Sequence, residues 1–145
     1  MNEFASSLLR VLTDKEHTNA IVLALTGQLG AGKTTFVQQL GSLLSIANKI
    51  NSPTFNIMKI YEVENNANFK FLVHLDVYRL DSVDELRPLH FNQYLEDLQF
   101  LTVIEWADKI KEVLPGDAIY LDFINTGEEQ RTIVIEGPAW LVESL

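Results

Sequence analysis

A glycine-rich segment with one lysine and one threonine holds the residues best suited to chemistry in this chain. It runs from Gly27 to Thr34 with the sequence GQLGAGKT, which matches the pattern G-x-x-x-x-G-K-[ST] at every specified position. Glycines let successive backbone N–H groups turn toward a phosphate, where a Cβ would crowd it. In such loops the lysine, here Lys33, reaches the β- and γ-phosphates, and the Thr34 hydroxyl coordinates Mg²⁺. The segment therefore predicts a nucleoside-triphosphate site.

The residues on either side predict the strand and the helix that such a loop requires. Residues 20–25 are apolar without alternation, which is typical of a strand buried on both faces. After Lys33 the apolar residues recur at helical spacing, and a helix that begins near Gly32 would add the positive end of its dipole to the site. A glycine turn that merely opens a helix would not need this context on both sides.

Two acidic residues follow apolar strands expected further along the chain. Residues 69–75 predict a strand that leads into Asp76, and residues 100–104 predict one that leads into Glu105. P-loop proteins use an acidic residue in this place to hold Mg²⁺ or to orient attacking water. Spacing does not rank Asp76 and Glu105 for that role. For Asp76, a hydrogen bond from His74 that only pins the loop is the structural alternative.

Residues 48–55 hold two short motifs. Asn48-Lys49-Ile50-Asn51 is close to the guanine-reading N-K-x-D, but the final Asp is absent and the segment directly follows the helix that begins near Gly32, so we reject it as a guanine-binding motif. Ser52-Pro53-Thr54-Phe55 is a turn signal with a hydroxyl on each side of a proline. It is either a simple connector or a switch segment in which Thr54 approaches the γ-phosphate or its metal.

The remaining patterns predict an α/β fold, a P-loop NTPase-like mixed β-sheet flanked by helices, in one domain over residues 1–145. The elements expected besides those above are an amphipathic helix over 4–12, a strand over 56–63 that forms an antiparallel hairpin with 69–75, a mostly helical stretch over 81–95 divided by Pro88, a short helix over 107–113, a closing hairpin of 118–123 with 132–136, and one or two helical turns in the tail.

Composition narrows the function classes. The 145 residues are 47% hydrophobic, which indicates a globular chain, and the net charge of −9 disfavours direct contact with nucleic acid. The absence of cysteine excludes disulfides, thiolate metal sites and cysteine catalysis. Apolar runs of about six residues are too short to span a membrane, and the N-terminus does not have a signal-peptide pattern. We therefore expect a cytoplasmic protein.

Four motifs occur in a fixed order along the chain: GQLGAGKTTF, SPTF, HLDVYRL and IEW. This set resembles the TsaE (YjeE) family of small bacterial P-loop ATPases, from about Leu25 to Leu114 and more weakly through Arg131. The resemblance implies ATP and Mg²⁺ as cofactors, and work beside the TsaB and TsaD proteins in threonylcarbamoyladenosine modification of tRNA. The tRNA would be contacted only indirectly, through that complex.

The resemblance also implies roles for individual residues. It gives Mg²⁺ to Thr34 and Glu105, and it places Thr54 and Asp76 in two switch-like segments. With the motif and the strand ends considered as well, Lys33, Asp76 and Glu105 are the catalytic candidates. The nucleotide-binding candidates, from the motif and the resemblance together, are Gly27, Gly30, Ala31, Gly32, Lys33, Thr34, Thr35, Thr54, Trp106 and Arg131. Arg131 is included in this set, although its place in the sequence gives no reason for it to enter the site.

Two other functions share the phosphate loop. A metabolite or nucleotide kinase would usually need several arginines around its phosphates and a lid segment, whereas this chain has only Arg10, Arg79, Arg87 and Arg131. A non-catalytic module would use ATP only to order a binding surface.

For hydrolysis, Arg79 is the best internal candidate to meet charge on the γ-phosphate, but strict alternation points it away from Asp76 unless the strand ends first. We therefore expect an ATPase that is slow alone and depends on a partner.

Overall fold

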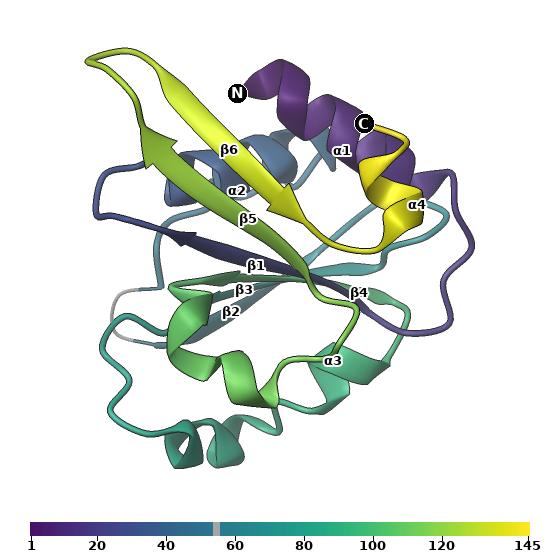
Figure 1. The fold of residues 1–145 in the computed structure, drawn as a ribbon. Coiled ribbons are helices and arrows are strands. Elements are labelled where there is room, and N and C mark those ends of the chain that lie inside the picture. Colours follow the sequence, from purple (N-terminus) through teal and green to yellow (C-terminus); the bar gives the residue numbers. More distant parts are fainter. Residues whose placement is uncertain (54–55) are drawn as a thin grey trace.

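The computed structural model describes residues 1–53 and 56–145, and within them six strands form one mixed sheet (Figure 1). In space the strands follow the order β2-β3-β4-β1-β5-β6. Their bounds are β1 Ile21–Gly27, β2 Met58–Glu62, β3 Phe71–Asp76, β4 Phe100–Glu105, β5 Ile119–Asn125 and β6 Arg131–Glu136. The four central strands are parallel, and each edge strand is antiparallel to its neighbour. The predicted mixed α/β sheet is confirmed, as are both hairpins.

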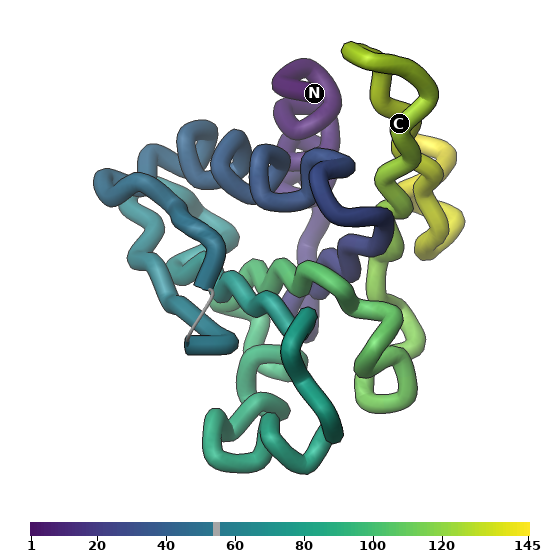
Figure 2. Tube along the Cα trace, turned by 90° about the vertical axis from the view of Figure 1, so that its left-hand side faces the viewer, coloured from purple at the N-terminus to yellow at the C-terminus, as the bar shows by residue number. Residues whose placement is uncertain are grey.

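Parallel pairing brings the carboxyl ends of three strands to one edge of the sheet. Leu25 near the end of β1 is paired with Glu105 of β4, and Glu105 is paired in turn with Asp76 of β3. Figure 2 shows this edge from the front, with the loops after the strands toward the viewer. Ligands of open parallel sheets bind at this edge. The phosphate loop and both candidate acids therefore meet there.

Helices cover both faces of the sheet (Figure 1). On one face lie α1 (Asn2–Thr13), α2 (Lys33–Leu43) and the short α4 (Ala139–Val142). On the other lie α3 (Gln93–Glu96) and two 3₁₀ helices, η1 (Val83–Leu89) and η2 (Ala107–Val113). In the part of the chain that is described, no helix has both the length and the apolar character needed to cross a bilayer.

The strand β1 explains why its sequence has no alternation. Leu23 and Leu25 pack into the core under α1 and α2, whereas Val22 and Ala24 pack into the core on the opposite face. All four are 3% exposed or less. Because both faces of β1 are covered, an apolar side chain is favourable at every position. The loop that follows β1 is thus anchored to a strand that is buried on both faces.

The segment after β3 differs from the helical stretch predicted for residues 81–95. It forms a 3₁₀ helix, a break and a single α-helical turn, and Pro88 lies inside η1 instead of dividing two helices. The chain turns at His90, whose φ of 51° is left-handed. Ser82 and Glu85 form a capping box at the start of η1. The predicted helix over 107–113 is likewise a 3₁₀ helix, η2.

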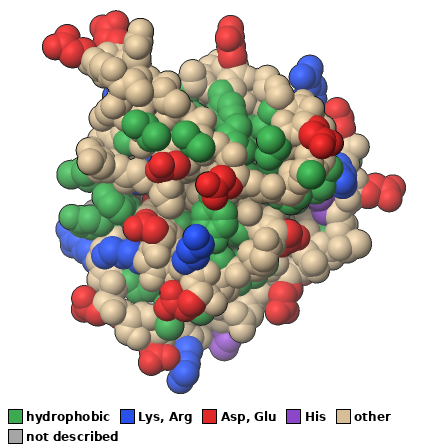
Figure 3. Space-filling view, in the orientation of Figure 1, with side chains coloured by type: hydrophobic (Ala, Val, Ile, Leu, Met, Phe, Trp, Pro, Cys, Tyr) green, Lys and Arg blue, Asp and Glu red, His purple; other side chains and the backbone are tan. Residues whose placement is uncertain are grey.

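The surface carries the acidic excess of the sequence. Figure 3 shows Asp and Glu side chains scattered over the face that carries β5 and β6, between hydrophobic and basic groups. Glu128 and Glu129 are exposed in the turn between these strands. At the phosphate loop, Leu29 is the most exposed large hydrophobic residue described, with 80% of its surface open.

Candidate nucleotide-binding site

The phosphate loop connects β1 to α2 through a backbone that only glycine adopts easily. Gly27 has a φ of 129°, and a Cβ at this position would lie 2.4 Å from the carbonyl oxygen of Phe123 in β5. Gly32, the N-cap of α2, has a φ of 107°. These conformations are strained for residues with a side chain. The glycines thus let β1 turn sharply into the N-terminus of α2, where backbone N–H groups can face an anion.

Lys33 folds back over its own loop. Its Nζ donates hydrogen bonds to the carbonyl oxygens of Gly27 at 2.6 Å and Gln28 at 2.9 Å. The same ammonium group lies 4.1 Å from the centre of the Trp106 ring. Only 4% of Lys33 is exposed. Its present partners are therefore carbonyl dipoles and an aromatic face.

Burial dominates the electrostatics of Lys33. It lowers the pKa of the amine below its ordinary value of 10.5. The carboxylates of Glu105 and Asp76 act in the opposite direction and raise that pKa, but by less. A phosphate oxyanion would stabilise the charged form of this buried ammonium group, because the anion would replace the favourable interaction with water that the group lost on burial.

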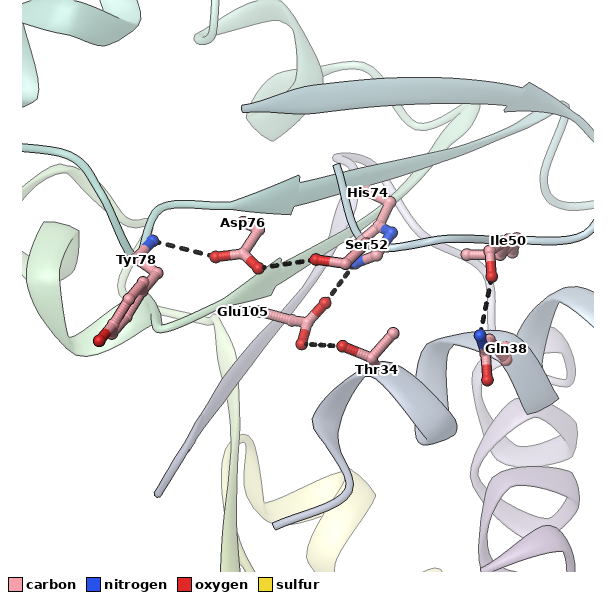
Figure 4. Close-up of polar contacts among 8 residues, drawn as sticks. All are labelled: Thr34, Gln38, Ile50, Ser52, His74, Asp76, Tyr78 and Glu105. Carbon is pink, nitrogen blue, oxygen red and sulfur yellow. Dashed lines mark hydrogen bonds and ion pairs between the residues drawn. The ribbon is translucent and has the colours of Figure 1, made fainter. Parts of the chain in front are cut away.

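Thr34, Glu105 and His74 form a continuous polar chain at the start of α2 (Figure 4). The Thr34 hydroxyl donates to Oε1 of Glu105 at 2.7 Å. The second carboxylate oxygen, Oε2, lies 2.6 Å from Nε2 of His74. Glu105 and His74 are 2% and 0% exposed. The carboxylate is therefore held from two sides inside the protein.

Asp76 has a different set of partners. Its Oδ2 accepts a hydrogen bond from the Ser52 hydroxyl at 3.1 Å, and its Oδ1 accepts one from the backbone N–H of Tyr78 at 3.0 Å. Asp76 thus joins the start of the 52–55 segment to the turn after β3. His74 bonds to Glu105, so the His74–Asp76 hydrogen bond considered from the sequence is not the contact that forms.

A cavity of about 680 Å³ lies in front of these groups. Most of the residues predicted to bind nucleotide or metal, or to act in catalysis, line it: Gly30, Gly32, Lys33, Thr34, Thr35, Asp76, Glu105, Trp106 and Arg131. Gly27 lines an adjacent cavity, and Ala31 is 1% exposed and packs into the core. Thr54 lies outside the described residues. The cavity thus joins residues that are separated by about 100 positions in sequence.

Arg79 lines this same cavity. The strand β3 ends at Asp76, so the alternation of a strand no longer governs the direction of the side chain three residues later. The sequence left two possibilities for Arg79: it would point away from Asp76 if the strand continued, or it could face the site if the strand ended first. The strand does end first.

Trp106 has an uncommon backbone conformation next to Glu105. Its φ of 60° is left-handed, and η2 begins directly after it. The ring contacts the ammonium group of Lys33 and the ring of Tyr78, whose centre is 4.7 Å away. Trp106 also lines the adjacent cavity, which extends toward β5 and β6. It therefore lines both cavities, as Leu29 does.

Sequence reasoning missed three polar contacts of the site. It did not identify His74 as the partner of Glu105 or Ser52 as the partner of Asp76. It also missed the hydrogen bond from the Thr26 hydroxyl to Asp122 at 2.9 Å, at the base of the loop. His74 could have been found from its place in an apolar strand, because a buried imidazole needs a polar partner.

The chain does not build a complete metal cage in the part that the structure describes, where no group of three or more His, Asp or Glu side chains is arranged to hold an ion. The pair Thr34 and Glu105 supplies one hydroxyl and one carboxylate at the mouth of the loop. Mg²⁺ in nucleotide sites takes few protein ligands and completes its octahedron with phosphate oxygens and water. The donor set therefore fits Mg²⁺ bound together with a nucleotide.

Comparison with protein families gives one match over most of the chain. Residues 1–133 match the family model described as "Threonylcarbamoyl adenosine biosynthesis protein TsaE". Among curated proteins, tRNA threonylcarbamoyladenosine biosynthesis protein TsaE of Bacillus subtilis is 39% identical over 112 residues, which are 77% of this chain and 66% of that protein. The protein of the same name from Rickettsia felis is 35% identical, over 89% of this chain and 72% of that protein. These matches thus span about two thirds of the relatives' length.

A solved structure has the same fold. The crystal structure of Bacillus subtilis YdiB superposes with a TM-score of 0.62 at 27% sequence identity, and the match covers 94% of this chain and 80% of that one.

Proposed function

The chain belongs to the TsaE family, which places it among proteins of threonylcarbamoyladenosine biosynthesis, and on this premise we propose that it is a Mg²⁺-dependent ATPase of that process. One observation carries the proposal: Lys33, the Thr34–Glu105 pair and Asp76 converge on one cavity at the phosphate loop. A binding module without catalytic activity would need the phosphate loop, but it would not need the buried carboxylate of Glu105 beside the Thr34 hydroxyl that binds the metal.

Lys33 binds the β- and γ-phosphates after leaving its present partners. The Gly27 and Gln28 carbonyl oxygens and the Trp106 ring hold the ammonium group at the loop. The backbone N–H groups of the loop and the N-terminus of α2 bind the remaining phosphate oxygens.

Thr34 and Glu105 hold Mg²⁺ through the hydroxyl oxygen and Oε1, directly or through water. The bound ion would neutralise charge on the β- and γ-phosphates. Glu105 can also orient the attacking water, because Oε1 is the carboxylate oxygen on the Thr34 side, toward the loop. Asp76 couples the site to the 52–55 segment through Ser52. We thus assign the metal to Glu105 and coupling to Asp76.

We propose that turnover depends on a partner that positions an arginine of the cavity. Two arginines, Arg79 and Arg131, line it, and neither lies on the phosphate loop itself. Transfer of the γ-phosphoryl group in P-loop enzymes is fast only when an additional positive charge meets the developing charge. We propose that docking to the TsaB–TsaD complex positions that charge. The net charge of −9 suits a basic partner surface and disfavours direct tRNA contact in the cytoplasm.

Tryptophan fluorescence tests nucleotide binding directly. In a Trp140→Phe variant the signal comes from Trp106, which contacts Lys33, whereas Trp140 lies beside Lys15 and His17, outside the cavity. We expect ATP and ADP with Mg²⁺ to change this fluorescence and GTP to compete poorly. Tighter binding of GTP, or no response to any nucleotide, would contradict the proposal.

A further inference from the structure

His74 is a buried polar residue with no place in the function described so far. It lies on β3, is 0% exposed, and has Nε2 2.6 Å from Oε2 of Glu105 on the adjacent strand β4. We propose that His74 is a positioning residue that fixes the Glu105 carboxylate with Oε1 directed toward Thr34 and the phosphate loop. This inference rests on the proposed ATPase function, because it concerns the same metal pair.

The contacts of the ring determine which nitrogen carries the hydrogen. A distance of 2.6 Å between Nε2 and a carboxylate oxygen requires a hydrogen between them, since two lone pairs would repel. The other nitrogen, Nδ1, is buried and has no hydrogen-bond partner within the described residues. A hydrogen on Nδ1 would leave an N–H group buried without an acceptor. The Nε2–H tautomer is therefore the one that satisfies the site.

The two carboxylate oxygens of Glu105 have partners that differ in how freely they can move. Oε2 is bound by His74, which is enclosed in the core. Oε1 is bound by the hydroxyl of Thr34, which lines the cavity and can rotate about its C–O bond. Only Oε1 can therefore exchange its partner for a metal or a water. A carboxylate that offers one oxygen in a fixed direction suits the near-octahedral geometry of Mg²⁺.

Packing alone does not call for a histidine at this position. The neighbours on the same face of the sheet, Leu72 of β3 and Val103 of β4, are apolar and fully buried. A polar pair in such surroundings is costly unless its hydrogen bonds are made. The pair therefore serves a purpose other than filling the core. The neighbouring Thr34 hydroxyl indicates that this purpose is to hold the Glu105 carboxylate toward the phosphate loop.

Two substitutions at His74 separate positioning from packing. His74→Leu fills the space but cannot donate, whereas His74→Gln places an amide N–H near the position of Nε2. Calorimetry with ADP, with and without Mg²⁺, gives the readout. For the Leu variant we expect the Mg²⁺-dependent gain in affinity to fall about 10–100-fold, with Mg²⁺-free affinity unchanged. The Gln variant should retain most of that gain.

Thr102→Val is the matched control. Thr102 is also 0% exposed on β4, but its hydroxyl donates to the backbone oxygen of Tyr94 at 2.6 Å on the opposite face of the sheet. It should lose stability without losing Mg²⁺ dependence. The proposal is overturned if His74→Leu keeps the full Mg²⁺ effect, if His74→Gln is as weak as His74→Leu, or if Mg²⁺-free ADP affinity falls by the same factor.

A spectroscopic test works even if the Leu variant does not fold. Imidazole ¹H–¹⁵N spectra of the nucleotide-free protein should show a hydrogen of His74 on Nε2. A hydrogen on Nδ1 alone would overturn the assignment. These readouts also separate the inference from the proposed function: absence of ATP turnover under all conditions would refute the ATPase, while the spectrum and the Mg²⁺ effect on ADP binding would still decide the role of His74.

Discussion

Asp76 and Glu105 are direct neighbours in the parallel register of β3 and β4, yet their carboxylates bind different parts of the site. Glu105 accepts from the Thr34 hydroxyl at the start of α2, and Asp76 accepts from the Ser52 hydroxyl. The two acids, equivalent by sequence pattern, are thus distinguished by their partners. One faces the phosphate loop and the other the segment that leads to Thr54.

The Thr34–Glu105 contact predicts a specific loss in Thr34→Val. The variant keeps the shape of the side chain but removes the hydroxyl, so Mg²⁺ should no longer increase the affinity for ADP. We expect a loss of about 10–100-fold in the presence of Mg²⁺, the range for an interaction with a charged group, and little change without Mg²⁺. Calorimetry measures both values. Thr26→Val, which removes the hydroxyl bonded to Asp122, is the control and should keep its Mg²⁺ dependence.

The different partners of the acids predict different defects in Asp76→Asn and Glu105→Gln. The Glu105 variant should still bind ATP but hydrolyse it poorly in a single turnover. The Asp76 variant should hydrolyse ATP at a rate closer to that of the parent but lose nucleotide-dependent capture of the TsaB–TsaD complex. If Asp76→Asn abolishes hydrolysis and Glu105→Gln leaves it intact, the two roles must be exchanged.

Local patterns predicted the elements that hold the site. The apolar run of β1, the glycine motif and the helical spacing after Lys33 each depend on neighbouring residues alone, and the structure confirms the strand, the turn and the helix. The hairpins formed by β2 with β3 and by β5 with β6 were also predictable, because their connections are short. These features required no knowledge of the tertiary arrangement.

Side-chain contacts between distant segments were not predictable in the same way. The pair His74–Glu105 depends on the order of strands in the sheet, and the pair Ser52–Asp76 depends on the path of the chain between α2 and β2; the sequence pattern encodes neither. Arg79 faces the cavity because β3 ends at Asp76, and strand ends are poorly defined by alternation. Arg131 also lines the cavity, although the residues around it give no signal that it would.

The backbone of the phosphate loop predicts unequal costs for two alanine substitutions. Gly27→Ala would bring a Cβ within 2.4 Å of the Phe123 carbonyl oxygen at a φ of 129°, and should cost about 3 kcal/mol of unfolding free energy. Gly30→Ala has a φ of 77° but no atom within 4 Å of the added Cβ, and should cost about 1 kcal/mol. Urea unfolding measures both. Equal costs would show that contact with β5 does not constrain the loop.

The burial of Lys33 predicts a pH effect on stability. Because the pKa of its amine is lower in the folded protein than its usual 10.5, the unfolded chain binds more protons in the alkaline window between the two values. The unfolding free energy of the protein therefore increases as pH rises through that window, and the increase is absent when pH falls below the pKa of Lys33 in the folded protein. The substitution Lys33→Met removes the contribution of Lys33 to this pH dependence.

Urea unfolding of the parent and Lys33→Met at several alkaline pH values tests this sign. The unfolding free energy of the parent minus that of Lys33→Met should increase with pH, because the titration of other groups cancels in the difference. A difference that decreases with pH would mean that the carboxylates of Glu105 and Asp76 outweigh burial at Lys33.

Steady-state ATP hydrolysis tests the central claim most directly. It should be measured for the protein alone, with tRNA alone, and with a TsaB–TsaD complex, each with Mg²⁺. We expect slow turnover alone, no change with tRNA, and a clear rise with the complex that is lost in Arg79→Ala. Lys33→Met should reduce the stimulated rate by about 10²–10³-fold. A high rate for the protein alone that the complex does not change, or a Lys33→Met variant as fast as the parent, would contradict the account.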